Sequence, residues 1–157
     1  MSRNAVKESV YGGLIGGIIF LIIQMALSAI IEGESVWDFI NRAAGILLGQ
    51  AAVSPFSQFQ LINFLTGLVI HLMLSAWYGI VLGFFVLNLS RAGASISGIL
   101  FGIVLYLVNF YLFVLFIPRF EISMNEITLV AHAAYGGVAA FAIKEIQIRL
   151  GHCVTCY

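Results

Sequence analysis

The feature that most constrains this chain is a set of long apolar stretches that contain no Asp, Glu, Lys or Arg. A bilayer core about 30 Å thick needs roughly 20 apolar residues in a helix to cross it. Four stretches approach that length: residues 11–31, 64–87, 96–117 and 127–143. A helix satisfies its own backbone hydrogen bonds, as lipid requires. The sequence therefore predicts an all-α integral membrane protein, a bundle of four transmembrane helices.

The overall composition supports this prediction. The chain is 62% hydrophobic and 9% charged, whereas a soluble domain carries roughly 25% charged residues. Its 157 residues suit a single membrane domain, 1–157, with the lipid bilayer as its main partner. The formal net charge of zero gives no indication of nucleic acid binding. The first apolar stretch exceeds the 7–15 residues typical of a signal peptide, so we expect it to be retained.

The cationic residues predict the orientation. Five of the seven Lys and Arg residues would lie on the side of the two termini, and Arg42 and Arg119 on the other. Cytoplasmic loops of membrane proteins carry the excess of such residues. We therefore expect both termini, including the tail 144–157, to be cytoplasmic.

The outer loop contains a further amphipathic segment, at about residues 35–50. Ser35 followed by Asp38 is typical of a helix start, and Trp37, Ile40 and Ala44 then recur at helical spacing. This pattern predicts an interfacial helix on the outer leaflet, with Asp38, Asn41 and Arg42 turned away from its apolar face. Small residues such as Gly45 would alternatively allow the helix to enter between the spans.

The sequence also contains an internal repeat. Gly13, Gly17 and Gln24 in the first span have the same spacing as Gly98, Gly102 and Asn109 in the third. The phrase SAWYG (75–79) in the second span resembles HAAYG (132–136) in the fourth. Glycines at this spacing allow close helix packing. We therefore expect two tandem helix pairs, related by an axis along the membrane normal.

Polar side chains of all four spans are predicted to share one layer. Counted at about 1.5 Å per residue, four of these side chains lie roughly 8–12 Å below the outer end of their helices. They are Gln24, His71, Asn109 and His132. Polar groups at such depth normally face the bundle interior. The predicted layer consists of Gln24, His71, Ser75, Tyr78, Asn109, His132 and Tyr135.

Three interpretations of this layer remain open. It is a hydrogen-bonded spacer that fixes helix register, or it lines a binding site or pathway for a small solute or a proton. In the third interpretation, His71 and His132 are axial ligands of haem b, and Arg119 meets a propionate. The layout of the two histidines is similar to that of membrane cytochromes b, although those proteins usually carry two His per helix.

The end of the chain carries a separate candidate site. His152, Cys153 and Cys156 include a Cys-x-x-Cys pattern that can bind a metal, although a closed zinc site would need one more ligand from a second chain. Two reduced cytoplasmic thiols are the simpler interpretation. No enzyme signature is present, since the spans contain no carboxylates and Ser75 near His71 has no carboxylate partner.

Three phrases, WDFINRAAGI (37–46), HLMLSAWYG (71–79) and AHAAYG (131–136), resemble a group of small bacterial four-span inner-membrane proteins. Some of these carry a sodium:proline symporter label, which the size of the chain contradicts. The resemblance implies a bacterial inner-membrane location and no particular activity. From the sequence, the leading expectation is an accessory or scaffold subunit of a larger membrane assembly or a homo-oligomer.

Overall fold

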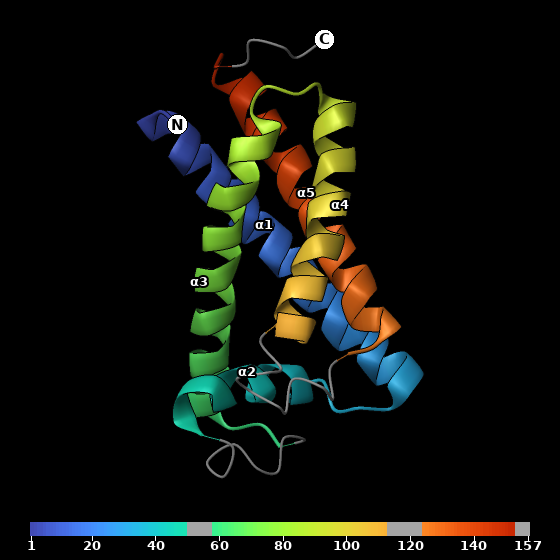
Figure 1. Cartoon of the computed structure of the whole chain (residues 1–157). Helices are drawn as coiled ribbons and strands as arrows, with labels where there is room; N and C mark the ends of the chain where they lie inside the picture. Colours follow the sequence, from blue (N-terminus) through green and yellow to red (C-terminus); the bar gives the residue numbers. More distant parts are fainter. Residues whose placement is uncertain (50–57, 113–123, 153–157) are drawn as a thin grey trace.

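The computed structural model describes residues 1–49, 58–112 and 124–152, and within these ranges every regular element is helical. Four helices in these ranges are long and apolar enough to cross a membrane. Figure 1 shows the elements: α1 (Arg3–Leu27) with a π-helical continuation η1 (Ser28–Glu32), α2 (Asp38–Leu48), α3 (Leu61–Val86), α4 (Arg91–Leu107) with a π-helical continuation η2 (Val108–Leu112), and α5 (Glu126–Arg149).

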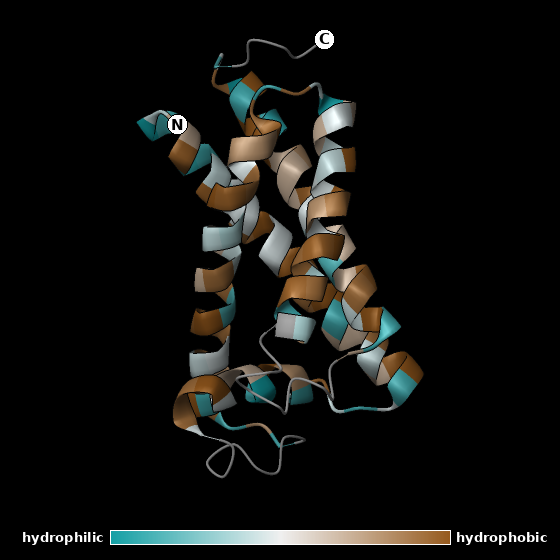
Figure 2. Cartoon of the chain, viewed as in Figure 1, coloured by the Kyte–Doolittle hydropathy of each residue, from teal (hydrophilic) through white to brown (hydrophobic). Residues whose placement is uncertain are grey.

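Three of the long helices begin at polar capping residues. The side chains of Ser2, Ser90 and Asn125 accept hydrogen bonds from backbone N–H groups in the first turns of α1, α4 and α5. Such caps satisfy donors that a helix start leaves free. The helices therefore extend past the apolar stretches into charged flanks, as Figure 2 shows by the hydrophilic residues at their ends. The predicted end of the third span, after residue 112, lies outside the described residues.

The four long helices form an incomplete ring. α4 packs along α5, α5 along α1, and α1 along α3, whereas α3 and α4 approach each other much less. Figure 1 shows α1 and α5 crossing behind the widely spaced α3 and α4, with α2 across the end of the bundle farthest from the start of α1. The largest opening between neighbouring helices therefore lies between α3 and α4.

Glycines bring α1 onto α3 and α4 onto α5 by corresponding contacts. A Cβ atom built on Gly13 would lie 2.8 Å from the Gly79 Cα, and one built on Gly98 would lie 2.8 Å from the Gly136 carbonyl carbon. One turn later, Gly17 meets the Ser75 side chain, just as Gly102 meets the His132 backbone. The two helix pairs thus pack through the residues that the sequence repeat aligns.

The two contacts between the pairs are not equivalent. Gly16 of α1 faces Ala139 of α5, where an added Cβ would lie 2.8 Å from the Ala139 Cβ. In the repeat, the residues at the corresponding positions are Phe101 on α4 and Leu82 on α3. Both belong to the apolar core or pack against it. Because these side chains are large, α4 cannot approach α3 as closely as α1 approaches α5.

The α2 helix buries Ile40 and Ala44 of the expected apolar face, and it also buries Asn41, which was expected to turn away from that face. Asn41 is only 1% exposed and donates to the Gln58 carbonyl at 2.9 Å, whereas Leu47 is 72% exposed. Gly67 of α3 lies directly against the backbone of Ile40, which lets α2 pack closely on α3. The hydrophobic spacing missed the burial of Asn41 because the Gln58 carbonyl satisfies its amide, and such a hydrogen bond leaves no mark in that spacing.

Candidate cavity between α3 and α4

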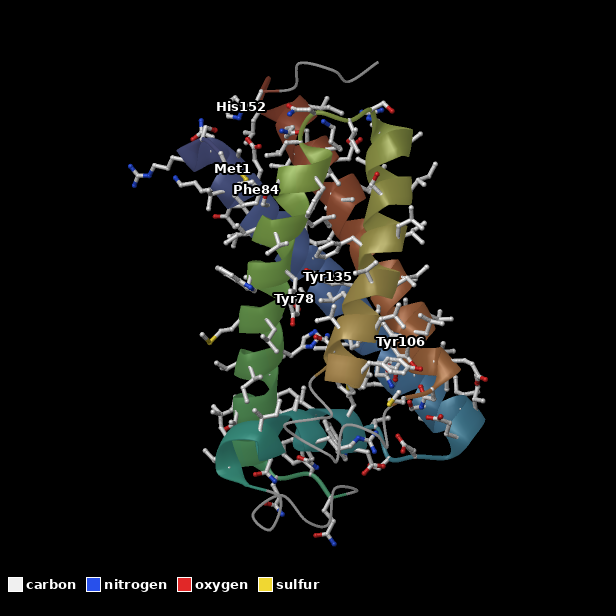
Figure 3. All side chains as sticks on the ribbon, in the orientation of Figure 1. Met1, Tyr78, Phe84, Tyr106, Tyr135 and His152 are labelled. Carbon is white, nitrogen blue, oxygen red and sulfur yellow. The ribbon has the colours of Figure 1, made fainter. Side chains whose placement is uncertain are left out.

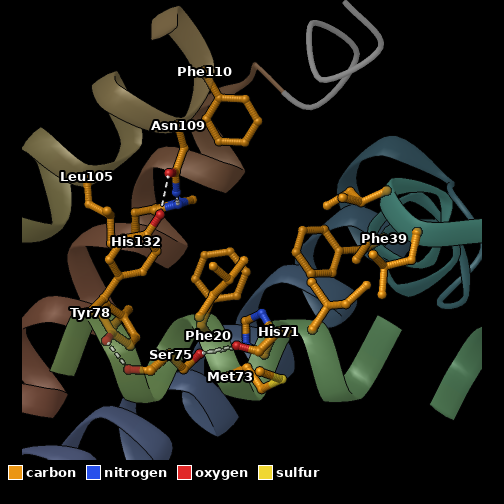
Figure 4. Close-up of a pocket in the computed structure, with 16 residues that line it drawn as sticks. Phe20, Phe39, His71, Met73, Ser75, Tyr78, Leu105, Asn109, Phe110 and His132 are labelled. Carbon is orange, nitrogen blue, oxygen red and sulfur yellow. Dashed lines mark hydrogen bonds between the residues drawn. The ribbon is translucent and has the colours of Figure 1, made fainter. Parts of the chain in front are cut away.

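A cavity of about 430 Å³ lies between α3 and α4. Figure 4 shows its lining, which comes from all five α-helices and from η2 and includes Phe20 of α1 and Phe39 of α2. Apolar side chains make up most of the wall. Its polar members are His71, Ser75, Tyr78, Asn109, His132 and Tyr135.

Six of the seven residues predicted to share a polar layer therefore line one cavity, and Gln24 does not. Gln24 is 1% exposed, and its Nε2 donates to Ser28 Oγ on the same helix at 3.1 Å. Its Oε1 has no hydrogen-bond partner among the described residues. The amides of the two repeats are thus used differently, because only Asn109 turns toward a histidine.

Asn109 connects α3 with α5 through hydrogen bonds. It accepts from the Tyr78 hydroxyl at 3.0 Å, and its Nδ2 lies 3.3 Å from His132 Nε2. His132 Nδ1 lies 2.8 Å from the Thr128 carbonyl. Since a carbonyl only accepts, the imidazole proton is on Nδ1, and Nε2 accepts from Asn109. Both ring nitrogens of His132 are therefore paired within the protein.

The pairing of His71 differs. Its Nε2 donates to the Gly17 carbonyl at 2.9 Å, and Ser75 Oγ donates to the His71 carbonyl at 2.8 Å. A neutral imidazole that carries its proton on Nε2 has an acceptor lone pair on Nδ1. Among the described residues, no hydrogen bond to this Nδ1 is found, and the atom is not among the fully buried unpaired ones. His71 therefore presents an unused acceptor next to the cavity.

Tyr135 joins the two halves of the bundle behind the cavity. Its hydroxyl donates to the Ser75 carbonyl at 2.7 Å, and its side chain is 3% exposed. Figure 3 shows Tyr78 and Tyr135 at the middle of the bundle, between the long helices. The corresponding tyrosines of the repeat thus make different hydrogen bonds, one to a side chain and one to the backbone.

Phe20, which sequence reasoning missed, separates the two histidines. Its ring centroid lies 5.2 Å from that of His71 and 4.8 Å from that of His132. The ring centroid of Phe39 lies 6.1 Å from that of His71. The available signal was that Phe20 follows Gly13, Gly16 and Gly17 at helical spacing and thus faces the bundle.

This arrangement disfavours haem between His71 and His132. Iron would lie between the two imidazoles, where the Phe20 ring stands, and Nε2 of each histidine is already hydrogen-bonded to protein. Arg119, the predicted propionate partner, lies outside the described residues. The haem hypothesis therefore remains a prediction without a fitting site.

The predicted metal site at the tail is only partly described. His152 Nδ1 lies 2.7 Å from Glu8 Oε1, and Figure 3 shows His152 beside the start of α1. Cys153 and Cys156 lie outside the described residues. In the part of the chain that the structure describes, no three His, Cys, Asp or Glu side chains are grouped to hold a metal ion. His152 thus connects the residues after α5 with the first turns of α1, at the same end of the bundle.

Comparisons with known proteins add no relative: no protein-family model, curated protein or solved structure matches this chain. The resemblance seen in short phrases of the sequence stays a prediction. The cavity is therefore the feature from which a function can be inferred.

Proposed function

We propose that this chain is a multi-pass membrane protein whose cavity between α3 and α4 binds a small apolar molecule from the bilayer. The four candidate spans support the membrane assignment. So do the large apolar side chains on their outer faces, such as Ile22 at 58%, Trp77 at 60% and Phe84 at 64% exposure. Lipid is the solvent in which such surfaces are stable.

The charge distribution supports the orientation with cytoplasmic termini. Arg3 and Lys7 lie at the start of α1, Arg91 at the start of α4, and Lys144 and Arg149 near the end of α5. These ends lie together, opposite α2 (Figure 1). By the excess of cations on the cytoplasmic side, α2 would face outward, and in a bacterial cell the chain would reside in the inner membrane.

The composition of the cavity wall carries the ligand-binding proposal. Small-molecule sites typically measure about 300–1,000 Å³ and combine mostly apolar walls with a few polar groups that fix orientation. The cavity here, at about 430 Å³ with six polar residues in its wall, has these properties. Its lining includes exposed residues of α3, Met73 at 68% and Leu74 at 43%, so it opens at the lateral surface of the bundle.

A photoreactive hydrocarbon tests this proposal. The protein in lipid nanodiscs would be exposed to dodecane carrying a diazirine, and labelled positions would be mapped by mass spectrometry. We expect labelling of Phe110, which is 4% exposed but lines the cavity, as well as of lipid-facing Ile22. Buried Leu82, which does not line the cavity, provides the background.

Matched substitutions separate the cavity from nonspecific labelling. Ala43→Trp places an indole in the cavity wall and should reduce labelling of Phe110 severalfold without affecting Ile22. Ala26→Trp on the exposed side of α1 should leave both unchanged. Labelling of Phe110 no greater than that of Leu82 in the wild-type protein would contradict the proposal.

The other functions expected from the sequence remain predictions. A proton or solute pathway would need polar groups along the whole bundle, and beyond Tyr78 the buried residues include apolar Leu82 and Val86 as well as polar Ser9 and Lys144. An accessory or scaffold subunit would co-purify with partner subunits from native membranes. The exposed apolar faces, which lipid contact alone explains, do not favour that role over ligand binding.

A further inference from the structure

We infer that the ligand of this cavity is a neutral amphiphile with a hydroxyl group that donates its proton to Nδ1 of His71. This inference rests on the ligand-binding function proposed above. It adds the chemical class of the ligand and the atom that recognises it.

The absence of charge in the cavity wall selects a neutral ligand. Among the described residues that line the cavity, none is Asp, Glu, Lys or Arg. An ionised group moved from water into an apolar environment without a charged partner loses a large amount of solvation free energy. Fatty acids, amines and phosphate esters are therefore excluded as ligands whose head group enters the cavity.

The hydrogen bonds of His71 select a ligand that donates. The Gly17 carbonyl, 2.9 Å from Nε2, requires the single proton of the neutral imidazole to be on Nε2. Nδ1 can then only accept. A ketone, an ester or an ether would face Nδ1 with a second acceptor, whereas the O–H of an alcohol or a phenol completes the pairing.

The other polar groups of the wall reinforce the role of His71. Both nitrogens of His132 are paired, and the Tyr78 hydroxyl donates to Asn109. The Tyr135 hydroxyl donates to the Ser75 carbonyl. Each of these three side chains can donate to a ligand only by breaking a bond within the protein. Of the four histidine nitrogens in the described wall, His71 Nδ1 is the one without a partner, so it can accept from a ligand hydroxyl with no such loss.

The opening between α3 and α4 leaves room for an alkyl tail on the ligand. Figure 4 shows His71 directed from α3 toward Phe20 and Phe39, with Met73 on the same helix at the edge of the cavity. Met73 and Leu74 are exposed on the lateral surface, whereas the corresponding contact between α1 and α5 is closed by Gly16 against Ala139. An alkyl tail would thus leave between α3 and α4 into the lipid.

Competition between two probes of equal chain length tests the inference. In nanodiscs, 1-dodecanol and 1-methoxydodecane would compete with a diazirine-bearing dodecanol for labelling of Phe110, at concentrations measured in the bilayer. We expect the alcohol to compete at roughly three- to tenfold lower concentration, the worth of one hydrogen bond. His71→Phe should abolish this preference, and His152→Phe, the same substitution outside the cavity, should retain it.

A spectroscopic measurement on the wild-type protein decides the matter where His71→Phe fails to fold. In ¹⁵N-histidine-labelled protein, 1-dodecanol should shift the Nδ1 resonance of His71 upfield, and the ether should not. Equal competition by alcohol and ether, or an unchanged Nδ1 resonance, would overturn this inference and leave the apolar site intact. Failure of every probe to label Phe110 would overturn both proposals.

Discussion

At the scale of single residues, Asn109 determines how the polar groups of the bundle are paired. Its carbonyl accepts from Tyr78 and its amide donates to His132, so one side chain on η2 satisfies groups on α3 and α5. In an apolar environment each of these groups would be costly if left unpaired. This relay, the chain of hydrogen bonds from Tyr78 through Asn109 to His132, therefore stabilises one arrangement of three helices. His71 takes no part in the relay.

Removal of the amide should expose this dependence. We expect Asn109→Leu to lower the free energy of unfolding by about 1–3 kcal/mol, because it leaves both the Tyr78 hydroxyl and His132 Nε2 without their partner. Tyr78→Phe should cost less, about 0.6 kcal/mol, the average for hydrogen bonds between membrane helices. Unfolding of the purified variants in mixed micelles measures both, and additive losses in the double variant would contradict the relay.

The same contacts lead us to expect a colourless protein. Because the Phe20 ring lies between His71 and His132, no bis-histidine haem should form. Protein purified from haem-replete cells should show no Soret band. A Soret band that disappears in His71→Ala and His132→Ala would show that Phe20 swings away and that the haem hypothesis is right.

The candidate site was predictable from the sequence to the extent that it depends on polar residues at a common depth. Counting along the helices placed His71, Asn109 and His132 at one depth, and all three line the cavity. Depth does not specify direction around a helix, and Gln24 consequently pairs with Ser28 on its own helix. The position of Phe20 depends on packing between three helices, which no single pattern encodes.

At the scale of helices, pairs of adjacent glycines allow α1 to pack on two neighbours. Gly13 and Gly17 face α3, while Gly12 and Gly16 face α5. The sequence repeat identified Gly13 and Gly17 because α4 has glycines at the corresponding positions, Gly98 and Gly102. It could not identify Gly12 and Gly16 as a contact with α5, because Phe101 stands where α4 would need the equivalent of Gly16.

Two adjacent glycines of α5 provide a matched test of this packing. A Cβ on Gly136 would lie 2.8 Å from the Gly98 carbonyl carbon and 2.9 Å from the Gly102 nitrogen, whereas one on Gly137 would meet only the Ile99 side chain within 3.9 Å. We expect Gly136→Ala to destabilise the fold by about 1–3 kcal/mol, the cost of overpacking. Gly137→Ala should change it by about 1 kcal/mol or less, because alanine favours the helix.

The free energy of unfolding in mixed micelles distinguishes the two variants. Gly79→Ala on α3, the repeat equivalent of Gly136, should behave like Gly136→Ala, since Gly79 meets the Gly13 backbone in the same way. Equal stability of the Gly136 and Gly137 variants would show that α4 and α5 do not pack through their backbones.

At the scale of the whole molecule, a repeated helix pair yields a bundle that is closed on one side and open on the other. The two pairs share their internal contacts, but small residues join α1 to α5 while large ones keep α3 from α4. The lateral opening through which we propose that a ligand enters therefore follows from a difference of a few side chains between two similar halves. It also requires the bundle to stand across the bilayer, with α2 at one surface.

Thiol labelling in intact bacterial cells tests that placement. With both termini cytoplasmic, a membrane-impermeant maleimide added from outside should modify Gln58→Cys, an exposed position beside α2, when the native cysteines are replaced by serine. The native Cys153 and Cys156 should react only after the cells are opened. Labelling of the native pair in intact cells, with protection of Gln58→Cys, would invert the orientation. Labelling of both Gln58→Cys and the native cysteines in intact cells would show that the bilayer does not separate them, and hence that the four apolar helices do not span it. The lateral opening beside His71 would then not face lipid.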